Sequence, residues 1–287
     1  MNFQLYNFIN FMNFQLYITW NVSPEIFNVF GLSVRWYGLL WALGFLLGYE
    51  IMRRIFKREN ISEAWLDKLF IYIFIGTVVG ARLGHCLFYQ WDYYSQNLIE
   101  ILFVWEGGLA SHGGAAGILL AMWLFSRNVS HKPMLWIMDR IVIPVALVGA
   151  LIRFGNLMNS EIYGTPTTMP WGFKFIRDMG NCVGDNTCYD WVTTALHPTQ
   201  IYEMIYCLIT FAVLLFIYFK TNLYQRRQGF AFGVFLIGIF LSRFLLEFLK
   251  NNQVDFEAAM LLNMGQLLSL PFILWGLYLI FFSKEEK

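Results

Sequence analysis

The sequence predicts an all-α polytopic membrane protein, with about seven transmembrane helices and a small extracytoplasmic head domain. Of the 287 residues, 58% are hydrophobic, 19% are aromatic and only 14% are charged. A soluble fold of this length has no interior large enough for so much apolar surface, so the chain is expected to lie in a bilayer. The net charge of +1 and the lack of a long basic run give no reason to expect nucleic acid as a partner.

The N-terminal segment, residues 1–34, contains no lysine or arginine, so it lacks the charged n-region of a cleaved signal peptide. Its aromatic and aliphatic residues are interleaved with Asn and Gln, a pattern typical of a segment that lies along the membrane surface. We therefore expect an extracytoplasmic arm over 1–34, followed by a seven-helix transmembrane domain over 35–287.

Seven apolar stretches approach the roughly 20 residues that cross a hydrocarbon core. They cover residues 36–52, 65–89, 107–125, 134–157, 198–219, 230–249 and 264–282. The loops on one side hold eleven Lys and Arg residues, and the loops on the other side hold three. Because basic residues concentrate in cytoplasmic loops, we expect the N-terminus outside and the C-terminus in the cytoplasm.

This topology places the longest hydrophilic segment, 159–197, on the outer face between the fourth and fifth spans. Its Gly, Pro and Asp content predicts a small head domain. Cys182 and Cys188 lie in it, and they pair only if the compartment is oxidising. Cys86 and Cys207 lie in apolar runs, where packing is a more common role than nucleophilic chemistry.

The stretch 149–164, G-A-L-I-R-F-G-N-L-M-N-S-E-I-Y-G, places four polar side chains where the fourth span should leave the bilayer: Arg153, Asn156, Asn159 and Glu161. An ionisable group at membrane depth is costly and indicates a functional site. Arg153 and Asn156 are three residues apart, so they share a helix face and can bind one ligand. An arginine that reaches to the interface, with asparagines capping the helix end, explains the pattern equally well.

The third span opens with W-E-G-G-L-A-S-H-G-G-A-A-G. Glycines on both sides of His112 allow a ligand or a neighbouring helix to approach the backbone. The alternative is that Gly113 and Gly117 form a G-x-x-x-G packing face and that His112 is a hydrogen-bonded structural residue. The four histidines show no paired ligand spacing, so we expect no metal site.

The fifth span starts at His197 and Pro198, with proline at the first helical position. Gln200 and Glu203 follow as part of a polar cluster. The favoured interpretation of this cluster is helix capping and anchoring at the level of the lipid headgroups.

The sixth span carries Arg243 and Glu247, which are four residues apart. The two side chains share a helix face and either neutralise one another or leave guanidinium donors free for an anion. Arg153 and Arg243 both lie in spans that run outward, and two arginines can bind a phosphate bidentately.

Together, five blocks resemble the prolipoprotein diacylglyceryl transferase family. They are R-W-Y-G-L, W-E-G-G-L-A-S-H-G-G-A-A-G, R-F-G-N-L-M-N-S-E-I-Y-G, H-P-T-Q-I-Y-E and M-G-Q-L-L-S-L-P, in family order from Arg35 to Pro271. The resemblance implies a bacterial inner-membrane enzyme without a cofactor. Such an enzyme transfers the diacylglyceryl group of phosphatidylglycerol to the lipobox cysteine of a prolipoprotein and releases glycerol phosphate.

The resemblance also implies site residues. The catalytic set that it implies is His112, Arg153, Arg243, Tyr37 and Glu161, with His112 as the proposed base. The set that it implies for phosphatidylglycerol binding is Arg153, Asn156, Asn159, Gly164, Arg243 and Glu247. Ile152, Leu157 and Ser160 depart from the family pattern, and Ser160 stands where a glycine usually precedes the glutamate.

The chemistry of such a transfer fits these residue types. A free thiol has a pKa of about 8.5, so a nearby base such as His112 is useful. The leaving group is a phosphate ester, whose growing charge Arg153 and Arg243 would stabilise. Tyr37, Asn156 and Glu161 would then position the headgroup or the base. The substrate supplies the cysteine, so neither a protein nucleophile nor a metal is needed.

Two other classes of membrane protein remain open. A secondary transporter also has charged residues at membrane depth and helices interrupted by glycine, but an odd number of spans and the lack of a match between the two halves weigh against it. A membrane protein that binds phospholipid without catalysis would use the same arginines only to hold phosphate.

Overall fold

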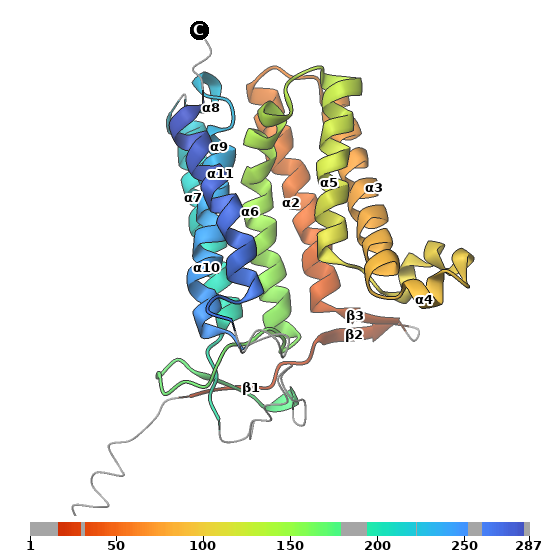
Figure 1. Cartoon of the computed structure of the whole chain (residues 1–287), viewed down its shortest axis with the longest axis vertical. Coiled ribbons are helices and arrows are strands. Elements are labelled where there is room, and N and C mark those ends of the chain that lie inside the picture. Colours follow the sequence, from red (N-terminus) through yellow and green to blue (C-terminus); the bar gives the residue numbers. More distant parts are fainter. Residues whose placement is uncertain (1–16, 30–31, 179–193, 222, 252–259, 284–287) are drawn as a thin grey trace, which may run out of the picture.

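The structure is a computed structural model, and it describes residues 17–29, 32–178, 194–221, 223–251 and 260–283. Long helices stand side by side in one bundle (Figure 1). They are α2 (Trp36–Arg58), α3 (Glu63–Phe88), α5 (Ser111–Phe125), α6 (Met134–Met158), α7 (Thr199–Lys220) and α11 (Met264–Phe282). A further helix is composite, with α9 (Phe230–Leu236), a π-helical turn η5 (Ile237–Leu241), α10 (Ser242–Leu246) and the 3₁₀ turn η6 (Glu247–Leu249).

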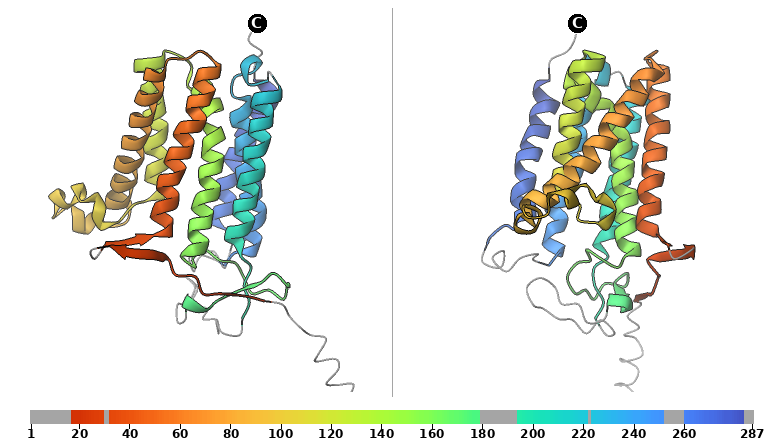
Figure 2. Two further views of the ribbon diagram at one scale, coloured as in Figure 1. Left: turned by 180° about the vertical axis from the view of Figure 1, so that it is seen from behind. Right: turned by 90° about the vertical axis from the view of Figure 1, so that its right-hand side faces the viewer.

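Short helical segments connect these helices. They are α4 (Trp91–Tyr94), η1 (Leu98–Leu102), η2 (Val104–Glu106), η3 (Ser126–Ser130), η4 (Ile176–Asp178) and α8 (Leu223–Arg226). In the bundle, α2 and α6 stand between the pair α3 and α5 on one side and α7, α9 and α11 on the other (Figure 2). The central position of α6 brings both of its ends into contact with the rest of the protein.

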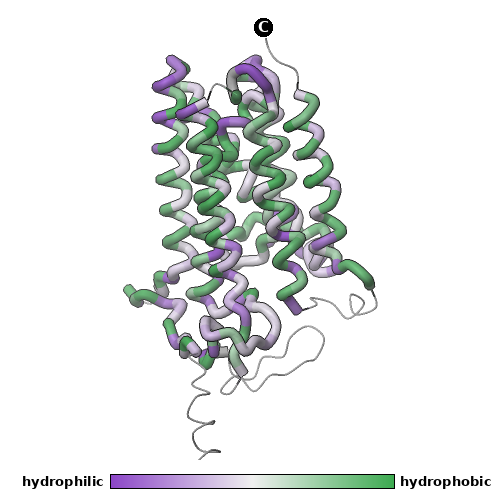
Figure 3. The backbone as a smooth tube through the Cα atoms, turned by 90° about the vertical axis from the view of Figure 1, so that its left-hand side faces the viewer, coloured by the Kyte–Doolittle hydropathy of each residue, from purple (hydrophilic) through white to green (hydrophobic). Residues whose placement is uncertain are grey.

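Among the described residues, five helices are long and apolar enough to cross a membrane. They are Glu63–Phe88, Met134–Met158, Thr199–Lys220, Phe230–Leu249 and Met264–Phe282. Hydrophobic residues follow the middle of the helices, and hydrophilic residues gather toward the two ends of the bundle (Figure 3). The prediction of a polytopic helical membrane protein is thus confirmed, and α2 and α5 stand alongside these five helices.

The third predicted span begins later than expected, because α5 starts at Ser111 rather than at 107. Gly107 and Gly108 have φ angles of +92° and +67°, which glycine adopts without steric cost but which are incompatible with a right-handed helix. The buried Arg82 of α3 holds the preceding segment through its guanidinium, which donates to the carbonyls of Gly107 (2.6 Å) and Glu100 (2.6 Å).

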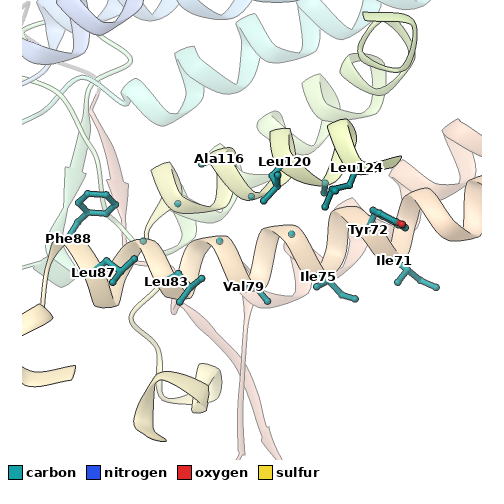
Figure 4. A pocket seen from close by; sticks show the side chains of 16 residues that line it. Ile71, Tyr72, Ile75, Val79, Leu83, Leu87, Phe88, Ala116, Leu120 and Leu124 are labelled. Carbon is teal, nitrogen blue, oxygen red and sulfur yellow. The ribbon is translucent and has the colours of Figure 1, made fainter. Parts of the chain in front are cut away.

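Helices α3 and α5 pack at backbone contact. A Cβ on Gly113 would meet the carbonyl oxygen of Gly80, and a Cβ on Gly117 would meet that of Gly76. This confirms the packing interpretation of Gly113 and Gly117, because only glycine lets the two backbones approach so closely. The outer face of the pair forms an apolar groove of about 560 Å³, lined by residues such as Val79 and Leu120 (Figure 4).

Four short strands lie at one end of the bundle in the described part of the chain, and we call this the strand end. Strand β1 (Ile18–Trp20) pairs in parallel with β4 (Phe173–Phe175), and β2 (Glu25–Val29) pairs antiparallel with β3 (Leu32–Arg35). The all-α expectation therefore holds for the bundle but is wrong here. These strands are too short to be recognised from the sequence, and β1 finds its partner more than 150 residues away.

The strand end is attached to α6 by a small apolar cluster. Leu157, Phe173, Phe175 and Leu196 are buried together, and the indole Nε1 of Trp20 donates to the carbonyl of Leu157 at 3.0 Å. Part of the expected head segment, 159–178 and 194–197, thus folds against α6. Cys182 and Cys188 lie outside the described residues.

The opposite end of the bundle is closed by the buried Arg140 of α6. Its Nε and Nη2 donate to Glu59 Oε2 at 2.8 and 2.6 Å, and its Nη1 donates to the carbonyl of Trp136 at 2.6 Å. The guanidinium also lies 3.8 Å from the centre of the Trp136 ring. Tyr218 of α7 donates to the other oxygen of Glu59 at 2.9 Å. The charges of Arg140 and Glu59 are thus paired within the protein.

Candidate active site

Helix α6 carries a second arginine, Arg153, near the strand end. Arg153 Nε lies 2.8 Å from Oε2 of Glu203 on α7, and the side chains of the two residues are 24% and 0% exposed. One Nη1 hydrogen of Arg153 reaches Asn156 Oδ1 at 3.4 Å, and no partner is found for Nη2 among the described residues. Arg153 is therefore fixed at one edge by an acid and is not an arginine that simply extends to the interface.

Glu203 is shared between two cations. Its Oε1 lies 2.6 Å from Lys250 Nζ, and Lys250 Nζ lies 3.5 Å from Oε2 of Glu247. The charges alternate from Arg153 through Glu203 and Lys250 to Glu247. We call these four residues the Arg153 cluster. This arrangement lowers the cost of burying ionised groups, because each neighbour has the opposite sign.

Asn156 and Asn159 converge on Glu161. Their amide Nδ2 groups donate to Glu161 Oε1 at 2.8 and 3.1 Å. Asn159 is the C-cap residue of α6, so the prediction of an asparagine at the helix end is confirmed for it. The side-chain amides, however, orient a carboxylate rather than bind the last carbonyls of the helix. The turn that brings Glu161 back places Ser160 at φ +57° and Ile162 at φ +58°, a left-handed conformation that glycine adopts more easily. This explains why the family pattern has a glycine at the position that Ser160 occupies in this chain.

The start of α7 fixes the same turn. Gln200 is buried and donates from Nε2 to the carbonyl of Glu161 at 2.6 Å, and Thr199 Oγ1 donates to the carbonyl of Ile162 at 2.7 Å. The prediction that Gln200 and Glu203 act as helix caps and surface anchors is therefore wrong. Gln200 fixes the turn after α6, and Glu203 binds Arg153.

Gly164 is placed by packing. A Cβ at this position would lie 2.7 Å from Thr199 Cγ2 and 2.9 Å from His197 Cβ, and it would collide with the carbonyl oxygen of Leu249. Gly164 also forms an isolated antiparallel bridge with Lys250. Its glycine character thus lets the turn after α6, the start of α7 and the end of η6 meet.

His197 belongs to a hydrogen-bonded chain at the surface of this end. Trp171 Nε1 donates to the Tyr202 hydroxyl at 2.8 Å, and this hydroxyl lies 3.1 Å from His197 Nδ1. An indole N–H can only donate, so the hydroxyl accepts from Trp171. Burial lowers the pKa of the His197 imidazole, which favours the neutral ring.

Arg243 follows the π-helical turn η5 on α10. Its Nε is buried without a hydrogen-bond partner in the part of the chain that the structure describes, and Glu247 pairs with Lys250 instead. The interpretation that Arg243 and Glu247 neutralise one another is therefore wrong. Arg243 and Arg153 are both close enough to the Tyr206 hydroxyl of α7 to interact with it electrostatically, so the two guanidinium groups approach the same region.

A cavity of about 590 Å³ lies between α2, α3, α5 and α6. Tyr37 of α2, Ser111 of α5 and Ile152 of α6 are among its lining residues, most of which are apolar. The Tyr37 ring lies against the backbone of α6, where a Cβ on Gly155 would come within 2.8 Å of Tyr37 Cδ2. Tyr37 thus lies against Gly155, two residues along α6 from Arg153, at the wall of a space that suits hydrocarbon chains.

His112 lies apart from this cluster. Its side chain is exposed near the start of α5, and it is not among the residues that line the cavity, although Ser111 and Gly114 are. No hydrogen bond of His112 is found within the described ranges, so the prediction that it is a hydrogen-bonded structural residue is wrong. The other predicted site residues lie at the strand ends of α2, α6 and the composite helix.

The described part of the chain offers no evident metal centre. Among the described residues, no group of three or more His, Cys, Asp or Glu side chains is arranged to hold a metal ion. Cys86 and Cys207 are buried free thiols. Cys207 Sγ packs 3.3 Å from the position of a Cβ on Gly149, which confirms that it is a packing residue.

Sequence reasoning missed two residues of the cluster, Glu203 and Lys250. Glu203 is an acid in an otherwise apolar span, and this signal alone indicates a functional site. Lys250 directly follows the sixth span, where a basic residue is unremarkable. Nothing in its sequence position indicates that its ammonium group turns back to a buried acid on α7.

Known proteins are similar to this chain over nearly its whole length. The family model described as prolipoprotein diacylglyceryl transferase matches residues 24–282. A protein of Porphyromonas gingivalis is 47% identical over 276 residues, which cover 94% of this chain and 95% of that protein. One of Tolumonas auensis is 46% identical (93% and 98% covered), and one of Chloroherpeton thalassium is 42% identical (96% and 97% covered). All three are named phosphatidylglycerol–prolipoprotein diacylglyceryl transferase.

Proposed function

This chain belongs to the prolipoprotein diacylglyceryl transferase family, and from that premise we propose that the Arg153 cluster receives the phosphate of the donor lipid. The protein is a transferase of the bacterial membrane. It transfers the diacylglyceryl group of phosphatidylglycerol to the thiol of the lipobox cysteine of prolipoproteins, with release of glycerol phosphate.

One observation supports the phosphate site most strongly. Arg153 is held only at one edge, and Arg243 has a buried Nε without a partner in the described residues. Both guanidinium groups lie near Tyr206. Donors that are fixed before the ligand arrives, in a region with little water, stabilise growing negative charge strongly. Arg153 and Arg243 therefore hold the phosphate, and Asn156, through Glu161, fixes the neighbouring turn.

The acyl chains of the donor take the cavity beside Tyr37. Its lining is mainly apolar, and Ile152, the neighbour of Arg153, forms part of the wall. A phosphate at Arg153 thus places the glyceryl carbon between the guanidinium groups and this cavity. Asn159, Gly164 and Glu247 complete the headgroup site by shaping the loops around it.

The transfer is a substitution at the glyceryl carbon that bears the phosphate ester. A base takes the proton of the cysteine thiol, the thiolate forms a C–S bond to this carbon, and the C–O bond to the phosphate breaks. The electron pair of this bond leaves with glycerol phosphate, whose charge the arginines stabilise. His112 is the proposed base. Because it is exposed beside the cavity-lining Ser111, the thiol approaches it from the membrane side of α5.

Glu161 is the second candidate for the base. Its Oε1 accepts two amide hydrogen bonds, which fix its orientation, and one of the donors, Asn156, also contacts Arg153. Glu161 in this role would leave His112 to position the peptide. The two assignments differ in the pH profile of His112→Gln, because only loss of the base removes the acidic limb of kcat.

The proposal includes the topology of the chain. Helices α2 and α5 complete a bundle of seven spans, residues 1–34 form an extracytoplasmic arm, and 159–197 form the head domain. The excess of basic residues in the loops of the opposite end favours a cytoplasmic C-terminus and an external N-terminus. The Arg153 cluster then lies at the level of the outer leaflet.

A direct assay tests the function. The purified protein is incubated with phosphatidylglycerol and a lipobox peptide, and the peptide is weighed by mass spectrometry. We expect a gain of one diacylglyceryl unit, which Arg153→Ala and Arg243→Ala slow strongly while both variants still insert in the membrane. An unchanged peptide mass with the wild-type protein would instead favour a transporter or a protein that only binds phospholipid.

A further inference from the structure

The geometry points to Glu203 as the residue that orients Arg153 toward the lipid phosphate, with Lys250 as the second cation that shares the Glu203 carboxylate. Glu203 is thus a positioning residue, since it acts through Arg153. The inference rests on the proposed role of Arg153 in holding the donor lipid.

The first step concerns the burial of the acid. The Glu203 side chain is 0% exposed, and an isolated carboxylate at such a depth would take up a proton rather than remain charged. Two cations lie beside it, Arg153 at 2.8 Å and Lys250 at 2.6 Å, and their charge offsets the cost of burying a carboxylate. Each of its oxygens faces one of them, so α7 presents a fixed negative charge to α6.

The second step concerns which edge of the Arg153 guanidinium binds Glu203. Glu203 takes the Nε edge of Arg153. A guanidinium has five N–H donors, and four of them are on Nη1 and Nη2. Because the acid binds at the side, Nη2 and the second hydrogen of Nη1 stay available for the paired hydrogen bonds that arginine makes with a phosphate, while the other Nη1 hydrogen reaches Asn156 Oδ1 at 3.4 Å. The same acid also fixes the rotamer of a long side chain, so less conformational entropy is lost when the lipid binds.

The third step concerns Lys250. Its side chain is 6% exposed and lies between Glu203 and Glu247. Its position is set by the backbone, because Gly164 bridges to Lys250 and the Thr165 amide donates to the Leu249 carbonyl at 2.8 Å. Without Lys250, the full charge of Glu203 would act on Arg153 and would compete with the phosphate. Lys250 therefore neutralises part of the Glu203 charge, so that less of it acts on Arg153.

A purely structural role is the main alternative, since the same ion pairs also join α6, α7 and the end of η6. Thermal stability responds to both roles, but the KM for phosphatidylglycerol responds only to the orientation of Arg153. A double-mutant cycle separates the two further. If Glu203 acts through Arg153, its replacement has no additional effect on lipid binding once Arg153 is absent.

The experiment uses the full chain in detergent with phosphatidylglycerol and a lipobox peptide. We expect Glu203→Gln to raise the KM for phosphatidylglycerol about tenfold, with the KM for the peptide unchanged. Glu203→Asp should recover part of this loss, and Lys250→Met should raise the same KM by a smaller factor. In the Arg153→Ala background, Glu203→Gln should leave the residual binding of phosphatidylglycerol vesicles unchanged.

The matched control is Glu59→Gln, which removes the acid that pairs with the other arginine of α6. It should lower the midpoint of thermal unfolding and leave the KM for phosphatidylglycerol of the folded protein unchanged. If Glu203→Gln behaves like Glu59→Gln, the inference is overturned and the acid is only structural. If Arg153→Ala itself leaves the KM unchanged, the proposed phosphate site fails, which is a different result.

Discussion

Helix α6 carries one arginine near each end, and the two are bound in different ways. Arg140 is 4% exposed, and it donates twice to Glu59, once to a carbonyl, and lies over the Trp136 ring. Arg153 is 24% exposed and bonds Glu203 by its Nε edge, with a long contact to Asn156. The residue type and the pairing with an acid are the same at both ends. The difference lies in the donors that stay free, and it separates a structural arginine from one that is ready to bind an anion.

The two ends also differ in how fully their buried polar groups are satisfied. Both ends hold residues other than glycine at positive φ, with Asn60 and His131 at the end of Arg140 and Ser160 and Ile162 in the turn after α6. Most of the buried polar side-chain atoms that lack a hydrogen-bond partner in the described chain lie at the strand end, on Ser160, Gln200, Glu203, Arg243 and Glu247. Unsatisfied polar groups thus concentrate at the end where we expect a ligand to bind.

The largest expected effect is on catalysis at the strand end. Arg153→Ala should lower the rate of diacylglyceryl transfer by roughly 10²- to 10³-fold, because a fixed donor to the leaving phosphate is lost. Arg153→Lys should remain well below the wild type, since an ammonium group cannot bind a phosphate bidentately. Transfer is measured by mass spectrometry of the peptide, with membrane insertion as the control. A normal rate in Arg153→Ala would remove the distinction between the two arginines.

The next effect is on stability at the opposite end. Arg140→Ala should destabilise the protein by roughly 3–5 kcal/mol, because it leaves Glu59 buried without its partner. Thermal unfolding in detergent measures this loss, and the transfer rate per folded molecule should stay close to that of the wild type. A specific loss of activity without loss of stability would mean that Arg140 also serves the reaction.

A substitution between α3 and α5 tests whether a change away from the Arg153 cluster affects only the stability of the protein. Gly117→Ala should cost about 1–3 kcal/mol, because its methyl group would collide with the Gly76 carbonyl and push the helices apart. Ala116→Leu is the control, since Ala116 is exposed in the apolar groove beside it (Figure 4). Equal midpoints of thermal unfolding for the two variants would contradict the close contact.

The smallest expected effect is a gain of stability. Ser160→Gly relieves a left-handed conformation that costs about 1–2 kcal/mol for a residue with a side chain. The greater freedom of glycine in the unfolded chain offsets about 0.5–1 kcal/mol of this. We expect a slightly higher midpoint of thermal unfolding and an unchanged transfer rate. A lower midpoint would indicate that the Ser160 hydroxyl stabilises the turn.

The sequence by itself determined the class of protein and the local parts of the site. An apolar fraction of 58% requires a bilayer, whatever the order of the helices. Arg153 and Asn156 are neighbours because residues three apart meet on one face of any helix. The blocks around His112 and Arg153 were sufficient to recognise the family, since each is a run of adjacent residues.

Only the tertiary structure decided which charges meet across helices. Arg243 and Glu247 are four residues apart and were natural partners, yet Glu247 pairs with Lys250 and Glu203 takes Arg153. The interruption of the helix by the turns η5 and η6 changes which side chains face one another. Membrane helices are apolar on most faces, and lipid tails are as apolar as leucine, so hydrophobic patterning does not fix their rotation or relative height. Contacts within one helix can therefore be predicted from spacing, whereas contacts between helices depend on how the whole bundle packs.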